Sequence, residues 1–283
     1  MTAPGATAPT FEGLAREHPE WQGWLDVMRL ALERAAAPEW QEIAVTPAPD
    51  RRAGAPWLAG AVIGLPENAT RRWTAALLQS AGARASGVDP APFLAAAVTL
   101  DAEGLAAAAS AAALDADRLR ALAHPAALPL LAACAAQAGA APAGWPHGYC
   151  PVCGAWPALA ELRGLELSRQ LRCARCGADW AAAWLACVFC GNDDHEALDG
   201  LVSEAAGSMR RVDTCRRCQG YLKTVTTLTA RSHAEVVLED LATVAYDVSA
   251  LDAGATRPPG LGWPPRVELQ LARRPGLLGR WRG

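Results

Sequence analysis

Four pairs of cysteines with the same two-residue spacing constrain this chain more than any other feature of its sequence. The pairs are Cys150/Cys153, Cys173/Cys176, Cys187/Cys190 and Cys215/Cys218, with 19, 10 and 24 residues between successive pairs. A single C-x-x-C pair also occurs in thioredoxin-like redox motifs, whereas two pairs about 15 to 20 residues apart are a strong signature of a metal site. The eight thiols are enough for two four-cysteine sites.

The residues around these pairs favour tight turns that clamp a metal. Glycine follows the second cysteine at Gly154, Gly177 and Gly191, where the chain is expected to need positive φ, and Gly220 is displaced by one residue in the fourth pair. Four thiolates in a tetrahedron suit zinc or iron of the rubredoxin type. Protein would fill all four coordination positions, so we expect closed, structural sites rather than hydrolytic ones.

Spacing leaves the pairing of these motifs open. The gaps of 19 and 24 residues each accommodate a β-hairpin, as in zinc ribbons. We therefore expect the first pair to share a metal with the second, and the third with the fourth. The alternative joins the first pair to the fourth and the second to the third.

A reducing compartment supports metal binding over disulfides. The first residues, MTAPGATAPTFEGLAREH, show no secretory signal. The uncharged run of residues 121–160 contains six prolines, which fits poorly with a membrane span. We therefore expect a soluble, cytoplasmic protein without membrane insertion, in which paired cysteines are metal ligands or catalytic thiols rather than disulfides.

The pattern along the chain predicts an α+β protein. We expect a helical domain over residues 1–137, with helices at 11–37 (broken near His18-Pro19), 67–85, 92–100 and 115–138, and a Pro/Gly-rich linker over 138–148. Residues 149–230 are expected to form two rubredoxin-like or zinc-ribbon units with short antiparallel strands, of which KTVTTLT is the clearest. A C-terminal helix over 231–254, with a capping box at Ser232 and Glu235, precedes a Pro/Arg-rich tail over 255–283, which we expect to wrap over the surface or stay disordered.

Several other residues near the motifs have plainer interpretations. Cys134 is expected to be a small buried residue, and His195 is interpreted as part of a solvated turn rather than an alternative ligand. A group of aromatic side chains is expected to shield the cysteine turns from water: Trp156, Trp180, Trp184 and Phe189.

The cysteine motifs and their neighbours resemble the formate dehydrogenase accessory protein family (FdhE-like). The matching pieces are GYCPVCGAWP, LRCARCGADW, CVFCGN, DTCRRCQGYLK and EDLATVAYD, and they cover residues 148–247. A weaker similarity reaches into the helical first half, at EHPEWQGWLDVMRLA. The tail departs from the usual family ending.

The resemblance implies a cytoplasmic accessory factor, not an enzyme, that recognises the molybdenum- or tungsten-dependent catalytic subunit of respiratory formate dehydrogenase during its maturation. It implies rubredoxin-type metal binding, supports iron beside zinc, and gives no catalytic residue. It assigns metal-ligand roles to all eight paired cysteines: Cys150, Cys153, Cys173, Cys176, Cys187, Cys190, Cys215 and Cys218. A homodimer is left open.

Two other functions compete with this one. Zinc ribbons often bind nucleic acid, but residues 150–223 hold nine basic and nine acidic residues, which gives no basic face for phosphate, so we expect no nucleic-acid partner. The second is electron transfer or thiol redox chemistry, since iron can change valence and zinc cannot. No flavin or dinucleotide fingerprint accompanies the cysteines.

Overall fold

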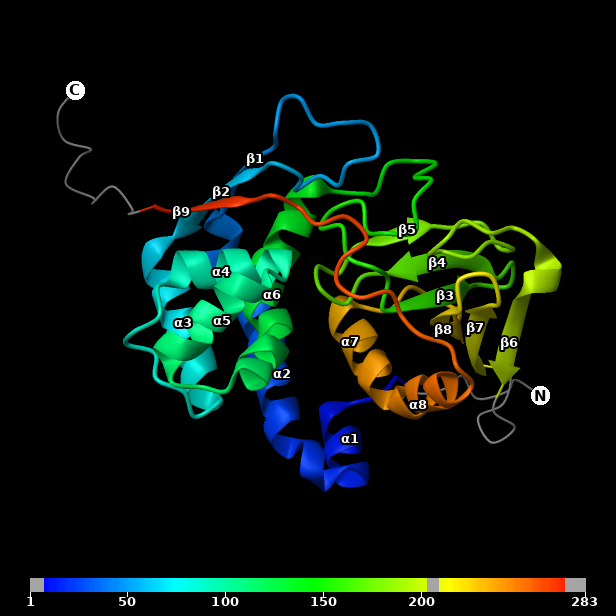
Figure 1. Cartoon of the computed structure of the whole chain (residues 1–283), viewed down its shortest axis with the longest axis horizontal. Coiled ribbons are helices and arrows are strands. Elements are labelled where there is room, and N and C mark those ends of the chain that lie inside the picture. Colours follow the sequence, from blue (N-terminus) through cyan, green and yellow to red (C-terminus); the bar gives the residue numbers. More distant parts are fainter. Residues whose placement is uncertain (1–7, 203–208, 273–283) are drawn as a thin grey trace. The chain divides into compact units, whose positions relative to one another are not determined.

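The computed structural model describes residues 8–202 and 209–272 of the chain, and these fall into two compact units (Figure 1). We call the first the cysteine unit; it gathers the described residues of Met1–Leu25, Arg52–Trp57 and Ala138–Pro265. The second, the helical unit, gathers those of Asp26–Arg51, Leu58–Gln137 and Arg266–Gly283. The predicted α+β fold class is confirmed.

A six-stranded sheet forms the centre of the cysteine unit. Its strands are β3 (Leu159–Arg163), β4 (Ser168–Arg172), β5 (Asp179–Ala181), β6 (Leu198–Val202), β7 (Arg210–Cys215) and β8 (Gly220–Thr227), in the order β5-β4-β3-β8-β7-β6. All neighbours are antiparallel except β3 and β8, which pair in parallel with Leu159 opposite Lys223. The two expected cysteine ribbons are therefore halves of one sheet, joined at this parallel pair.

Helices cover parts of this sheet. α7 (His233–Ala242) and α8 (Val244–Asp252) follow β8 in the chain, and α8 packs on β7 and β8 around Val212, Tyr221 and Ala250. The capping box of Ser232 and Glu235 is present at the start of α7. The expected single helix over 231–254 is two helices, because the chain leaves helical geometry at Thr243 (φ −110°, ψ 21°).

The N-terminal helices also belong partly to the cysteine unit. α1 (Phe11–Glu17), the 3₁₀ turn η1 (Pro19–Trp21) and the start of α2 (Gln22–Ala35) confirm the expected break near His18-Pro19. Leu14 and Leu25 pack against Leu238 of α7 in one small core. This packing is why the chain divides differently from the contiguous domain expected over residues 1–137.

The helical unit contains the later part of α2, the 3₁₀ turn η2 (Pro38–Glu42) and four further helices. These are α3 (Glu67–Ser80), α4 (Pro90–Thr99), α5 (Ala102–Ala112) and α6 (Ala116–Ala138). Trp73 is fully buried and donates its indole N–H to the carbonyl of Ala126 in α6 over 2.9 Å. α5 was not among the expected helices. Its signal is Asp101, whose carboxylate accepts from the amide of Gly104 at 2.8 Å as an N-cap.

A small sheet completes the helical unit and corrects two expectations. It holds β1 (Ala44–Thr46), β2 (Val62–Pro66) and β9 (Glu268–Ala272), with β1 antiparallel and β9 parallel to β2. The first half of the chain is thus not purely helical. Residues 268–272, expected in a tail without regular structure, form a strand because Leu269 and Leu271 align with Ile63 and Leu65 of β2. Residues 273–283 of that tail lie outside the described part.

One helix among the described residues, α6, is long and apolar enough to cross a membrane. About two thirds of its most apolar window, 67%, is buried inside the protein, and Pro125 and Pro129 lie within it. Core helices of soluble proteins pass the same test of length and composition, so α6 is weak support for a span.

Candidate metal centres

Three of the four cysteine pairs fold into the same turn. In each, the amide after the second cysteine donates to the carbonyl of the first: Gly154 to Cys150 at 3.0 Å, Gly177 to Cys173 at 2.9 Å and Gly191 to Cys187 at 2.9 Å. The three glycines have φ of 75°, 81° and 72°. The prediction of positive φ is confirmed for these three, and the turn aims both sulfurs of a pair in one direction.

The fourth pair reaches a similar turn differently. Gly220 does not take positive φ; the residue before it, Gln219, does, with φ of 56°. Gly220 is needed for space instead, because a Cβ there would lie 2.6 Å from the ring of Phe189. The displaced glycine therefore has a packing role and not the conformational role that the sequence suggests.

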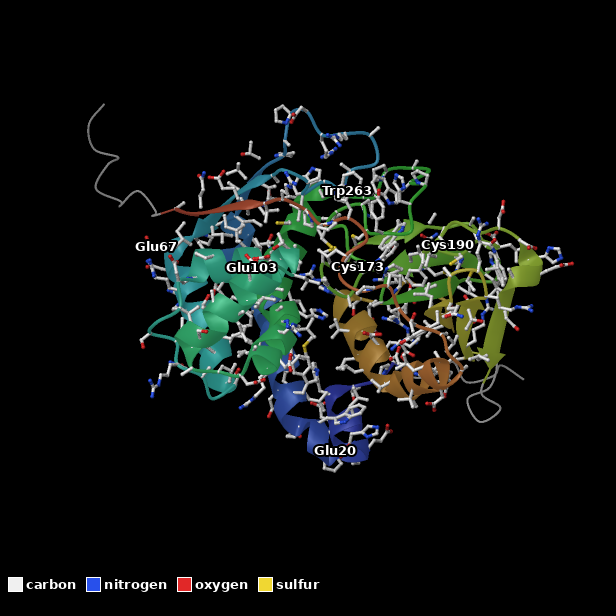
Figure 2. The ribbon with its side chains drawn as sticks, in the orientation of Figure 1. Glu20, Glu67, Glu103, Cys173, Cys190 and Trp263 are labelled. Carbon is white, nitrogen blue, oxygen red and sulfur yellow. The ribbon has the colours of Figure 1, made fainter. Side chains whose placement is uncertain are left out.

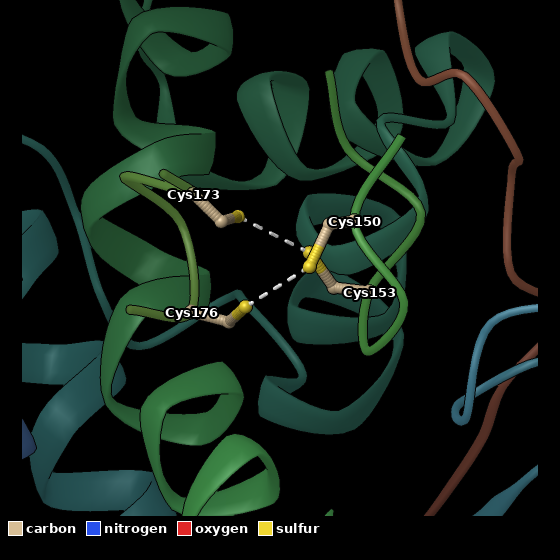
Figure 3. A group of neighbouring side chains, drawn as sticks. All are labelled: Cys150, Cys153, Cys173 and Cys176. Atoms are coloured by element: carbon tan, nitrogen blue, oxygen red, sulfur yellow. Dashed lines mark hydrogen bonds between the residues drawn. The ribbon is translucent and has the colours of Figure 1, made fainter. Parts of the chain in front are cut away.

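The first and second pairs meet in one cluster, which we call the first cluster. Cys150 Sγ lies 3.5 Å from Cys176 Sγ, and Cys153 Sγ lies 3.5 Å from Cys173 Sγ. Figure 3 shows the two turns facing each other, with all four sulfurs pointing into the space between them. Each of these side chains is at most 2% exposed.

The third and fourth pairs form the second cluster. Cys187 Sγ lies 3.6 Å from Cys218 Sγ, and Cys190 Sγ lies 3.8 Å from Cys215 Sγ. Cys187 and Cys215 are buried, whereas Cys190 and Cys218 are exposed. Figure 2 labels Cys173 of the first cluster and Cys190 of the second. The structure thus brings the pairs together in the first of the two arrangements left open by the spacing.

The sheet explains this pairing. The hairpin of β3 and β4 lies between the first and second pairs, and β6 and β7 lie between the third and fourth. The two strands of an antiparallel hairpin begin and finish at the same end. The cysteine turns before and after each hairpin therefore lie next to each other at that end.

The geometry of both clusters fits a tetrahedral metal ion. The closest sulfurs are 3.5 to 3.8 Å apart, far longer than the roughly 2.05 Å of a disulfide. Four sulfurs about 2.3 Å from a central ion would be about 3.8 Å apart. All four sulfurs of each cluster lie within 4.8 Å of one another. Each donor set therefore fits zinc or iron, and these distances do not separate the two metals.

The proton affinities of the thiols show why such clusters need a cation. Burial raises the pKa of Cys150 and Cys176 well above the usual thiol range, while hydrogen bonds from neighbouring thiols hold the pKa of Cys153 well below it. Burial also raises the pKa of Cys187. Burial acts in the same direction on Cys215, but hydrogen bonds from backbone N–H groups and neighbouring thiols together outweigh it and lower the pKa of that thiol. Packed thiols cannot all ionise together unless a positive ion compensates their charge.

The other residues singled out in the sequence behave unevenly. Cys134 is fully buried in α6, as expected, and exposed His195 starts the 3₁₀ turn η3 (His195–Ala197) outside both clusters. Trp180 is 2% exposed, but Trp184 is 46% exposed and donates its indole N–H to the carbonyl of Leu167. Trp184 also lines a cavity together with Cys187 and Cys215, so the expectation that it shields a cysteine turn from water stays a prediction.

A network of buried ion pairs beside the sheet was missed by the sequence reasoning. Lys223, the single lysine, is 3% exposed and lies 2.7 Å from both Asp240 and Asp247. Tyr221 donates to Asp247 at 2.9 Å, and its burial raises its pKa to about 12. The signal was present in the motifs YLK and EDLATVAYD, because an isolated charge among apolar residues needs a buried partner.

Arg172 and Glu161 form a second buried pair, which links β4 to β3. Glu161 is fully buried and accepts from Arg172 at 2.5 Å and from Arg163 at 2.5 Å. Arg172 also donates to the carbonyl of Arg231, just before α7. These contacts bond the segment before α7 to the half of the sheet that carries the first cluster.

The sequence of this chain is similar to those of FdhE proteins over part of its length. A sequence model of the FdhE C-terminal domain matches residues 185–260. FdhE homologues from Aquifex aeolicus and Pseudomonas aeruginosa are each 34% identical, over 113 and 116 residues, which is 39% and 38% of this chain. These alignments span only 39% and 37% of the two curated relatives, so the chain matches less than half of their length.

The structural similarity is wider than the sequence similarity. The crystal structure of the FdhE protein from Pseudomonas aeruginosa superposes with a TM-score of 0.57 and 25% identity, over 90% of this chain and 93% of that one. The match thus extends over most of the chain, including the part in which the sequence resemblance is weak. Taken with the two cysteine clusters, it confirms the resemblance read from the motifs: the chain is similar to FdhE proteins, in sequence over part of its length and in fold over most of it.

Proposed function

We propose that this protein is a cytoplasmic accessory factor, not an enzyme, that binds the catalytic subunit of respiratory formate dehydrogenase during its maturation. The observation that carries the proposal is the presence of two four-cysteine clusters on one sheet in a chain with an FdhE-like fold. In this proposal the clusters hold the client-binding surface in shape, and no catalytic residues are assigned.

Two metal ions, iron or zinc, are the proposed cofactors. Their ligands are the cysteines of the first cluster, Cys150, Cys153, Cys173 and Cys176, and of the second, Cys187, Cys190, Cys215 and Cys218. With all four positions filled by thiolates, such ions supply structural cross-links between turns. The chain's own contribution is to hold the turns at the ends of two hairpins, so that loss of one ion loosens two turns at once.

Charge pairing supports a protein client over nucleic acid. Three of the five basic residues near the fourth cysteine pair are paired with acids: Arg210 with Glu239 at 2.6 Å, Arg211 with Asp213 at 2.7 Å, and Lys223, which is also buried, with Asp240. The other two, Arg216 and Arg217, are exposed and bond to the carbonyl of Glu196 and the side chain of Asn192. Phosphate binding depends on unpaired cations that can displace counterions. The three acid-paired cations are already engaged within the unit.

Electron transfer is a second candidate, favoured by the half-exposed second cluster. An iron ion held by Cys190 and Cys218 near the surface would lie close enough to solvent for a redox partner to approach. Iron in protein isolated from the native host, with a reversible reduction potential, would support this role. Zinc in both clusters would exclude it.

Capture of the client tests the proposed function directly. The full chain, tagged and expressed in its native host, is expected to retain the formate dehydrogenase catalytic subunit. The double variant Cys173→Ser/Cys176→Ser is expected to lose it, because the first cluster no longer closes. Cys134→Ala, which removes a buried thiol outside both clusters, is the matched control and should retain the client. Failure of the unaltered chain to capture this subunit would overturn the proposal.

A further inference from the structure

The two clusters differ sharply in exposure although their cysteine spacing is the same. All four cysteines of the first cluster are 0–2% exposed. In the second cluster, Cys187 is 8% and Cys215 is 2% exposed, while their partners in the C-x-x-C pairs, Cys190 and Cys218, are exposed to solvent. Each pair of the second cluster therefore has one buried and one exposed cysteine.

Chain segments from three places cover the turns of the first cluster. The carbonyl of Pro151 accepts from the amide of Trp57 at 2.7 Å, and that of Gly154 accepts from Trp263 at 2.9 Å. The carbonyl of Ala174 lies 2.7 Å from His233 Nε2, at the start of α7. A Cβ at Gly154 would lie 2.0 Å from the carbonyl oxygen of Trp263, so the packing there is tight.

The turns of the second cluster are covered only in part. The amide of Cys187 donates to the carbonyl of Asn192 at 2.8 Å, as the equivalent amides do in the first two turns. The carbonyl of Val188 approaches Gly148, and the carbonyl of Gln219 accepts from the amide of Thr256 at 2.7 Å. A Cβ built at Gly191 meets no atom within 4 Å, in contrast to Gly154 at the same place in the first turn. Phe189 packs on Gly220 beneath the cluster and leaves Cys190 and Cys218 open.

Two cavities also reach the second cluster from its protein side. One, of about 340 Å³, is lined by Cys187 and Cys215, and the other, of about 580 Å³, is lined by Cys187. Neither is lined by a cysteine of the first cluster. An incoming donor atom can therefore approach the second cluster along routes that the first does not share.

We infer that the second cluster is an exchangeable metal site and that the first is a permanent one. The inference rests on the proposed metal binding at both clusters and adds a division of labour between them. Access controls metal exchange, because the metal leaves only when a new ligand reaches it or a thiolate swings into water. Cys190 and Cys218 are the ligands that give way, to soft donors such as a soluble thiolate or to a chelator. Each departing thiolate keeps its electron pair, so no oxidant or reductant is required.

Release kinetics on the full chain test this inference. Protein loaded with two equivalents of zinc is mixed with an excess of the chromophoric chelator 4-(2-pyridylazo)resorcinol, and the absorbance of the zinc complex is followed. The expected record has two phases of one equivalent each, with rates that differ roughly tenfold or more. A single phase carrying both equivalents would overturn the inference and leave the two-metal proposal intact.

Alkylation assigns the phases to cysteines without any mutation. Iodoacetamide added with the chelator alkylates each thiol that the metal has left. Peptide mass spectrometry of samples taken over time shows when each cysteine is alkylated. Cys190 and Cys218 are expected in the fast phase, and Cys150 and Cys176 in the slow phase. Earlier alkylation of the first cluster would reverse the assignment and overturn the inference.

Matched variants separate failure of this inference from failure of the proposed function. Cys190→Ser and Cys153→Ser each change the second cysteine of one pair. Cys190→Ser should abolish the fast equivalent and keep the slow one, whereas Cys153→Ser should lose the slow one or fail to fold. If Cys153→Ser does not fold, Cys190→Ser and the alkylation record still decide. A chain that binds fewer than two equivalents would contradict both the two-metal proposal and the inference.

Discussion

Glycine after a cysteine pair serves two separate physical needs in this protein. At Gly191 the need is conformational, since φ is 72° but the space around a Cβ is empty. Gly154 has a similar φ of 75°, and the carbonyl of Trp263 also lies so close to it that a side chain has no room. Identical sequence patterns thus hide different tolerances to substitution.

Alanine at these two glycines should separate the two needs. Gly191→Ala is expected to lower the free energy of unfolding by about 1–2 kcal/mol, the cost of a left-handed conformation for a residue with a Cβ. Gly154→Ala should cost about 1–3 kcal/mol more, because the Trp263 carbonyl must move. Urea unfolding of the metal-loaded proteins measures both values. Equal losses of unfolding free energy would mean that the Trp263 carbonyl moves aside without destabilising the protein.

Single ion pairs matter at the scale of elements where they join a strand to a helix. Lys223 on β8 bonds Asp247 of α8 at 2.7 Å and the backbone carbonyl of Asp240 in α7 at 2.8 Å. Its side chain is 3% exposed, so removing its charge leaves Asp240 and Asp247 with only the longer contacts of Arg257, at 3.9 and 3.8 Å, as cationic partners. The loss of one member of a buried pair costs more than the pair contributes.

Lys223→Met should therefore destabilise the cysteine unit by about 3 kcal/mol. Its matched control is Arg217→Met. Arg217 lies between Cys215 and Cys218, is exposed, and its side chain makes one long contact, 3.5 Å to Asn192. The control is expected to change stability by less than about 0.5 kcal/mol. Thermal unfolding followed at Trp fluorescence compares them. A Lys223→Met protein as stable as the control would show that the two carboxylates are hydrated without their cation.

The elements that sequence could predict are those with local signals. The β-branched run KTVTTLT supplies the second half of β8, which ends at Thr227, and the expected helix over 92–100 corresponds to α4, capped by Asp89. Local spacing also favoured the observed pairing of the cysteines over its alternative, because a gap long enough for a hairpin separates the two motifs of each cluster. The parallel contact of β3 with β8 could not be predicted, since the two strands are about 60 residues apart in the chain and no local preference encodes their register.

Exposure was equally hidden from the sequence. Cys153 and Cys190 occupy the same place in their motifs, yet one is fully buried and the other is exposed. The difference is made by segments distant in the chain, such as Trp57 and Trp263, which bond to the first turn. Tertiary contacts of this kind depend on the whole fold, so motif spacing indicates the ligands and not their accessibility.

At the scale of the whole molecule, the two units have different sources of stability. The helical unit is held by apolar packing around fully buried side chains such as Trp73 and Phe93. The cysteine unit places its two clusters at the ends of the sheet's hairpins, so in our proposal metal binding contributes to its folding. Small turns with few apolar side chains gain much of their stability from such ions.

Removing both metals should therefore affect the two units unequally. After treatment with chelator and a reductant, amides of β3, β4 and β7 are expected to lose protection from hydrogen exchange, because the thiols of both clusters can no longer share a cation. Amides of α3, α4 and α6 should keep their protection, since these helices pack in the helical unit around apolar side chains. Exchange followed by mass spectrometry resolves the two sets of peptides, and adding zinc back should restore the first set. Equal loss of protection in both units would mean that they unfold as one cooperative body and that the clusters stabilise the entire chain.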